Sequence, residues 1–243
     1  MFESWVVGRF VEYLELYGPL SDADRAAAEA LPVARRRFEA GEDIIVEGDA
    51  PLQCRLLISG LAFRHKTLRD GRRQIMSFYV PGEVCDIEGL LLAMDHGVSA
   101  LGRAEVGFIP HAAMEALLDA HPAIARALWR SEMVENAVAR EWMVGMGRRT
   151  AYARIAHLFC EMYARLSAVG LVENNRCRFP ITQTHLSDSL GLSVVHTNRV
   201  LQALRGDGLL SFRGGELIVH DWPGLQAAGE FDPTYLHMRS AAT

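Results

Sequence analysis

The residues with the clearest chemical pattern lie between Ile181 and Arg205, in the segment ITQTHLSDSLGLSVVHTNRVLQALR. Thr182 can cap a short helix and Ser193 can cap a second one. Gly191 suits a left-handed turn between them, because a residue without a Cβ adopts that backbone without steric cost. Two short helices joined by a tight glycine turn have the spacing of a helix–turn–helix. The pattern therefore predicts a helix that enters the major groove of DNA.

The second predicted helix has an apolar face and a polar face. Arginine can bind guanine with two hydrogen bonds, asparagine or glutamine can pair with adenine, and an aliphatic group can touch the methyl of thymine. The alternative is a solvent-exposed helix face that happens to carry these types. The outward residues, which we predict to contact base edges, are Val195, His196, Asn198, Arg199 and Gln202.

A β-hairpin is predicted directly after this helix, in LLSFRGGELIVHDW. Gly214 and Gly215 form a turn signal between two short alternating segments. A hairpin at this place makes a wing, and Arg213 at its tip can reach a DNA phosphate. The segment as a whole predicts a winged helix–turn–helix.

Two further kinds of element precede this segment. Between Arg35 and Pro110 short alternating stretches are separated by glycines, which predicts a small closed β-roll. A long helix follows, from about Ala123 to Met146. One apolar stripe on it is expected to pair with a second copy of the chain, although it can also pack on its own β-roll. The residues of this predicted dimer seam are Ile124, Leu128, Val134, Val138 and Trp142.

These elements predict an α+β fold class. We expect a β-roll sensor domain with N-terminal helices over 1–122, a dimerisation helix with a hinge at Gly145 and Gly147 over 123–147, and a winged helix–turn–helix over 148–243. Of the net charge of −5, the first 147 residues carry −7 and the rest +2. This asymmetry fits two domains with different partners.

Composition excludes several other classes. Half of the 243 residues are hydrophobic and 23% are charged, which is not the balance of a disordered or collagen-like chain. No apolar run reaches the ~18 residues of a membrane span, and the first residues lack a basic signal-peptide region, so we expect a cytoplasmic protein without membrane contact. No cysteine pair has metal-ligand spacing, so we predict no metal site. A redox role stays open for Cys54, Cys85, Cys160 and Cys177.

The sequence resembles the Crp/Fnr superfamily of bacterial transcription regulators from about Leu20 to Val219. GEDIIVEGD, LLISGLAFRH and PGEVCD resemble its sensor domain, and the segment from Ile181 resembles its DNA-binding domain. The segment VVHTNR, together with RRTAYARIAHLFCE upstream of it, is most similar to a FixK-like branch of the α-proteobacteria. The resemblance implies a homodimer that binds a palindromic site in double-stranded DNA. RNA polymerase is then an expected partner.

Individual residues carry over only in part. Arg199 matches the arginine that contacts a guanine in this family, whereas Val195 stands where a glutamate is common. The change removes an acceptor for cytosine N4, so the operator is expected to differ at that base pair. Thr182 and Gln183 match positions that contact the DNA backbone, and we predict phosphate contacts for both and for Ser193.

The sensor lacks the residues that hold a cyclic nucleotide in this family. Ile87 and Val98 occupy the places of the ribose-binding glutamate and the phosphate-binding arginine, although a shifted register would bring in Glu88 and Arg103. We therefore expect another effector or none. The residues expected at any effector pocket are Asp86, Glu88, Val98 and Ser99.

Three alternatives remain for the β-roll. A heme sensor would use Cys85, His65 or His96 as an axial ligand, whereas an iron–sulfur sensor lacks cysteines before position 54. A cupin-like enzyme needs paired histidine ligands, and His65, His96 and His111 are scattered. We therefore predict no cofactor and no enzymatic activity, while leaving heme or a small-molecule effector open.

Overall fold

The computed structural model describes residues 4–238 and divides into two compact units. The first contains the chain up to Lys66 and Ser77–Glu135, and the second contains Thr67–Met76 and Asn136–His237. The division therefore falls inside the long helix α4 (Pro122–Arg148), which continues through Gly145 and Gly147. No helix among residues 4–238 is long and apolar enough to cross a membrane.

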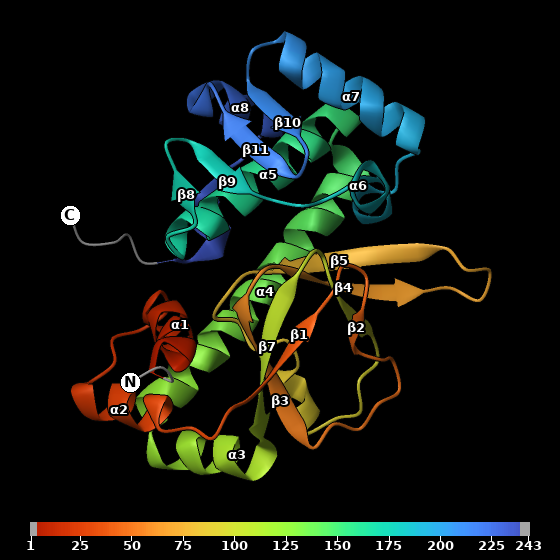
Figure 1. The fold of residues 1–243 in the computed structure, drawn as a ribbon. Coiled ribbons are helices and arrows are strands. Elements are labelled where there is room, and N and C mark those ends of the chain that lie inside the picture. Colours follow the sequence, from red (N-terminus) through yellow and green to blue (C-terminus); the bar gives the residue numbers. More distant parts are fainter. Residues whose placement is uncertain (1–3, 239–243) are drawn as a thin grey trace. The chain divides into compact units, whose positions relative to one another are not determined.

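The first unit is built on a β-roll of two antiparallel sheets, as the alternating segments predict (Figure 1). One sheet has the order β1-β7-β3 and the other has the order β2-β6-β4-β5. Apolar side chains such as Phe38, Leu57, Tyr79, Val98 and Val106 fill the roll. The strands are β1 (Ala34–Phe38), β2 (Asp43–Ile45), β3 (Gln53–Ser59), β4 (Ala62–Thr67), β5 (Arg73–Tyr79), β6 (Gly97–Ala100) and β7 (Ala104–Pro110).

Helices share a second apolar core with strands β3 and β7 of the roll. They are α1 (Ser4–Glu15), α2 (Asp22–Glu29), α3 (His111–Ala120) and the first part of α4, while the short helix η1 (Ile87–Leu90) follows β5. Ser21 caps α2 as its sequence predicts, with a reciprocal bond from its backbone to Asp24. Phe10, Leu14 and Leu56 belong to the resulting core.

The predicted dimer seam is wrong, because the structure buries it within a single chain. Ile124 and Leu128 belong to the core of the first unit, and Val134 and Val138 are also buried. Trp142 is buried in the second unit, where its indole nitrogen donates to Glu161. The spacing identified a buried stripe correctly, but periodicity alone does not show whether the covering surface belongs to the same chain.

The exposed face of α4 carries a second stripe, and this one has the 3–4 spacing of a helix seam. Trp129 is 68% exposed, Met133 53% and Met143 69%. Asn136 and Arg140 lie between them and are exposed as well. Large apolar side chains that remain in water along one helix face indicate a surface that binds a partner.

The second unit is a winged helix–turn–helix (Figure 1). Strands β10 and β11 form the predicted wing, with Arg213 opposite Glu216 and Gly214 and Gly215 in the turn. A four-stranded sheet of order β10-β11-β9-β8 continues from it. The elements are α5 (Ala151–Ala168), β8 (Val172–Glu173), β9 (Arg176–Arg178), α6 (Gln183–Leu190), α7 (Val194–Gly206), β10 (Leu210–Arg213), β11 (Glu216–Val219), α8 (Trp222–Gly229) and η2 (Pro233–Leu236).

A buried carboxylate joins the end of the second unit to its central helix. Glu161 of α5 is fully buried and accepts hydrogen bonds from Trp142 Nε1 at 3.1 Å and Tyr235 Oη at 2.7 Å. Arg165 Nη1 lies 3.8 Å from the same carboxylate. His157 Nε2 is 3.1 Å from Tyr235 Oη. The bonds of Tyr235 to Glu161 and His157 hold the segment after α8 against α5.

The turn of the helix–turn–helix has the conformation that its glycine predicts. Gly191 ends α6 with φ 61° and ψ 39°, which is left-handed backbone. Ser193 then caps α7 by accepting from the backbone of His196. Behind the turn, Ser187 Oγ and Thr197 Oγ1 lie 3.2 Å apart in a buried contact between the two helices.

Replacing Gly191 with alanine should therefore lower the free energy of unfolding by about 1–2 kcal/mol, since alanine is strained at positive φ. Urea denaturation followed by circular dichroism measures the change. The control is Gly206→Ala at the end of α7, where a new Cβ meets no atom within 4 Å and helix propensity favours alanine. Equal effects of the two substitutions would contradict the assigned role of the turn.

Candidate nucleic-acid interface and sensor cluster

The outward face of α7 presents the predicted base-contacting residues. Thr197, Val200, Leu201 and Leu204 are buried, and this fixes the rotation of the helix about its own axis. As a consequence Val195, His196, Arg199 and Gln202 are exposed and Asn198 is partly buried.

The first turns of both helices are held by local caps. Thr182 accepts from the backbone of His185, and Ser193 accepts from that of His196. Both hydroxyl groups were predicted to contact phosphate, and both retain lone pairs while they cap. The exposed backbone N–H groups at a helix start also attract anions, so the two caps are suitable places for a phosphate.

The structure brings α7, the start of α6 and the wing around one groove of about 710 Å³. It is lined from α6 by Thr182 and Gln183, from α7 by Asn198 and Gln202, and from the wing by Arg213. These residues were predicted separately as base or phosphate contacts, and the fold gathers them on one concave surface of the second unit.

Asn198 and Gln183 are bonded to each other across this groove. Asn198 Nδ2 donates to Gln183 Oε1 at 3.2 Å. The pair links the two helices of the motif, so either side chain would have to exchange this bond for one to DNA.

Sequence reasoning missed Arg205 as a member of the surface. Arg205 lines the same groove, and its Nη2 donates to Phe212 O at 3.2 Å, which ties α7 to the wing. Arg205 follows Gln202 by three residues, which places it on the outward side of α7. This spacing is the pattern from which its position could have been predicted.

In the first unit, three of the four predicted pocket residues are structural. Asp86 is buried and accepts from the backbone and the guanidinium of Arg55 at 2.6 and 2.8 Å. Ser99 donates to Asp43 at 2.7 Å, and Val98 is fully buried in the roll. The strand β6 places the side chains of Val98 and Ser99 in packed surroundings, and an effector pocket at these residues stays a prediction.

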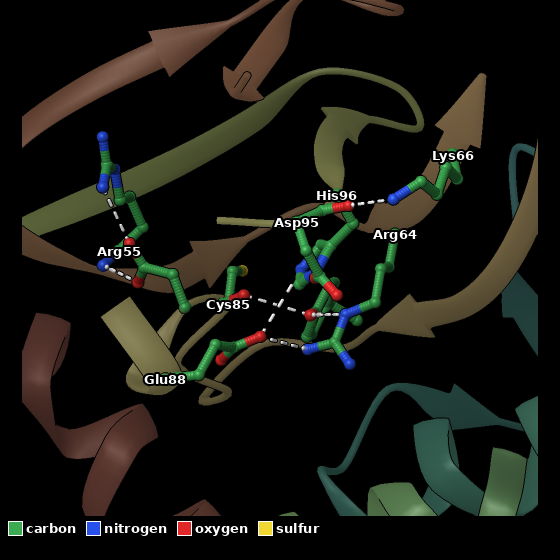
Figure 2. Close-up of polar contacts among 9 residues, drawn as sticks. Arg55, Arg64, Lys66, Cys85, Glu88, Asp95 and His96 are labelled. Carbon is green, nitrogen blue, oxygen red and sulfur yellow. Dashed lines mark hydrogen bonds and ion pairs between the residues drawn. The ribbon is translucent and has the colours of Figure 1, made fainter. Parts of the chain in front are cut away.

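The fourth residue, Glu88, belongs to a polar cluster that the sequence did not predict (Figure 2). Arg64 of β4 donates from Nε to Tyr79 Oη at 2.7 Å and from Nη2 to Glu88 Oε1 at 3.2 Å. His96 Nε2 lies 3.5 Å from the same oxygen of Glu88. Figure 2 shows Arg64, Glu88 and His96 pointing toward one another. The cluster joins β4, η1 and the loop before β6, which are too distant in sequence for any motif to connect.

Helix α4 adds a carboxylate to this cluster. Burial, and after it the charge of Glu88, raise the pKa of Glu132 from 4.5 to about 8, while Arg64 opposes the rise. Glu132 is thus largely protonated at neutral pH, and it interacts with the same arginine that holds Glu88.

The four cysteines named in the heme and redox alternatives are all buried. Burial raises the pKa of Cys85 well above its usual value, raises those of Cys54 and Cys160 to about 12, and raises that of Cys177 to about 11. Such thiols are poor nucleophiles and poor ligands near neutral pH. His65 contacts Ser99 at 2.7 Å. Among residues 4–238, no group of three or more His, Cys, Asp or Glu residues is placed to hold a metal ion.

Glu132→Gln should flatten the pH dependence of stability. The folded chain keeps a proton on Glu132 that the unfolded chain releases, so stability falls as pH rises from 4.5 to about 8. Thermal unfolding midpoints at pH 5 and pH 8 should differ less in this variant than in the wild type. Glu29→Gln, at an exposed site on α2, is the control. Parallel profiles for wild type and Glu132→Gln would contradict the assignment.

Known proteins with similar sequences match both units. Residues 35–121 match the cyclic nucleotide-binding domain, and residues 153–228 match the Crp-like helix-turn-helix domain. The transcriptional activator protein FnrL of Cereibacter sphaeroides is 28% identical over 200 residues, which is 80% of this chain and 80% of FnrL. The nitrogen fixation regulation protein FixK of Bradyrhizobium diazoefficiens is 28% identical over 189 residues, covering 77% of this chain and 78% of FixK.

Among solved structures, FixK2 from Bradyrhizobium japonicum superposes with a TM-score of 0.72 at 26% identity, covering 82% of this chain and 98% of that one. A β-roll of the cyclic nucleotide-binding type, a long helix and a winged helix–turn–helix define a class of DNA-binding transcription regulators. The chain belongs to the Crp/Fnr family of that class, and its FnrL and FixK relatives support the FixK-like branch.

Proposed function

We propose that this protein is a homodimeric regulator that binds a palindromic DNA site with α7 and whose β-roll does not take a cyclic nucleotide. The observation that carries the proposal is the outward face of α7, where Arg199 and Gln202 stand exposed while Thr197 and Leu204 are buried. A helix set in this way presents its polar side chains to base edges when it lies in the major groove.

The exposed stripe of α4 supports the homodimer. Trp129, Met133 and Met143 recur at the spacing of a two-stranded seam, with Asn136 between them. A buried asparagine at such a position fixes the register of a helix pair. The dimer would place two copies of α7 on half-sites about one helical turn apart, ~34 Å along DNA.

The arginine cluster of the β-roll supports the proposal about the effector. A cyclic phosphate is an anion and needs an unpaired cation opposite it. Here Arg64 is already bonded to Tyr79 and Glu88, and the carboxyl groups of Glu132 and Glu135 lie close enough to affect its pKa. The cluster therefore offers no free positive charge to a phosphate. Contact with RNA polymerase stays a prediction.

Arg199→Ala should weaken binding to the best operator by about 1–3 kcal/mol and relax selection at one base pair, because a bidentate contact to guanine is lost. Fluorescence anisotropy on the operator and on its single-base variants measures both effects. Arg213→Ala, at the exposed predicted phosphate contact of the wing, should weaken all of these sequences by the same factor. Equal losses on every operator for Arg199→Ala would contradict its role in base reading.

Met133→Glu should produce a monomer, because two carboxylates would meet in the proposed seam. Light scattering after size-exclusion chromatography measures the mass, and DNA affinity should fall with it. Leu52→Glu is the matched control, since Leu52 is an apolar residue 83% exposed in the first unit and outside the stripe. A Met133→Glu variant that remains dimeric would show that another surface pairs the chains.

A further inference from the structure

The first turn of α7 carries an exposed apolar patch. Val194 is 45% exposed and Val195 is 63% exposed, directly after the capping residue Ser193. Within the described range from Ala151 to His237, these are the large hydrophobic side chains that stand exposed. The neighbouring outward residues His196 and Arg199 are polar.

The folding of the second unit does not account for these two valines. A β-branched side chain loses rotamer freedom in a helix and lowers helix stability relative to alanine. An exposed position regains little of this through packing. The patch therefore indicates contact with a ligand rather than a contribution to the core.

We propose that Val195, flanked by Val194, contacts the 5-methyl group of a thymine and selects a T·A base pair in each half-site. The inference rests on the proposed function, since it needs α7 in the major groove. Base-pair edges in that groove display one apolar group, the thymine methyl. Valine has no donor or acceptor with which to read any other feature.

The selected thymine should lie close to the guanine that Arg199 contacts. Val195 and Arg199 are four residues apart, so they share one face of α7 and are separated by about 6 Å along the helix. Base pairs are spaced about 3.4 Å apart. The thymine and the guanine are therefore expected within about two base pairs of each other.

The stiffness of valine makes the contact selective. Its side chain has one strongly preferred rotamer in a helix, so the two methyl groups hold a defined position before DNA binds. A methyl placed there is buried on binding without further loss of side-chain entropy. A base pair without a methyl leaves a gap at the same place.

Uracil substitution tests the contact directly. Each thymine of the selected operator is replaced in turn by uracil, which removes the methyl and preserves base pairing, and affinity is measured by anisotropy. For the wild type, one or two positions per half-site should show about a fourfold loss, the effect of burying one methyl group. Val195→Ala should bind the parent operator more weakly and show no added loss with uracil at those positions.

Replacing the thymine with cytosine gives a second test of the methyl contact. Replacing the same T·A pair with C·G should weaken wild-type binding, and 5-methylcytosine should restore part of it by returning the methyl to the groove. Val195→Ala should show no such restoration. Val46→Ala, at a valine 53% exposed in the first unit, is the matched control and should behave as wild type.

Two results would overturn the assignment. Wild-type affinity that is unchanged by uracil at every position would remove the methyl contact, while DNA recognition by α7 would stand. A Val195→Ala variant with unchanged helix content that remains as sensitive to uracil as the wild type would assign the contact elsewhere. Absence of any sequence-specific binding by the wild type would instead contradict the proposed function, and this assignment with it.

Discussion

The rotation of α7 about its own axis is the constraint on which the DNA interface depends. Thr197, Val200, Leu201 and Leu204 are buried, so the helix cannot turn without exposing apolar surface and breaking the contact between Ser187 and Thr197. If the helix rotated by the angle between two successive residues, a side chain that is now buried would take the outward position of Arg199. The chemistry of the outward face therefore follows from the packing of the inward one.

In the first unit, several charged side chains are paired with one another within the chain. Asp86 is held by Arg55, and Glu88 by Arg64, which also bonds Tyr79. Residues 35–121 match a cyclic nucleotide-binding domain, but Arg64 of this roll is paired with Glu88 of the same chain.

The sequence predicts the two units unequally, and the reasons are physical. Caps and a positive-φ glycine act over a few residues, so Thr182, Gly191 and Ser193 could be assigned without knowledge of the rest of the chain. The buried face of α4 depends on which tertiary surface covers it, so periodicity could not tell the core stripe of Ile124 and Leu128 from a seam. The cluster of Arg64, Glu88 and His96 joins distant segments, and no local pattern encodes such a meeting.

Selection of binding sites from a random DNA pool, with purified protein and no added ligand, tests the central claim most directly. The account predicts an enriched palindrome whose half-sites are centred about one helical turn apart, ~34 Å. Recovery of no enriched site, or of single half-sites without symmetry, would contradict a dimer that reads DNA without a cyclic nucleotide.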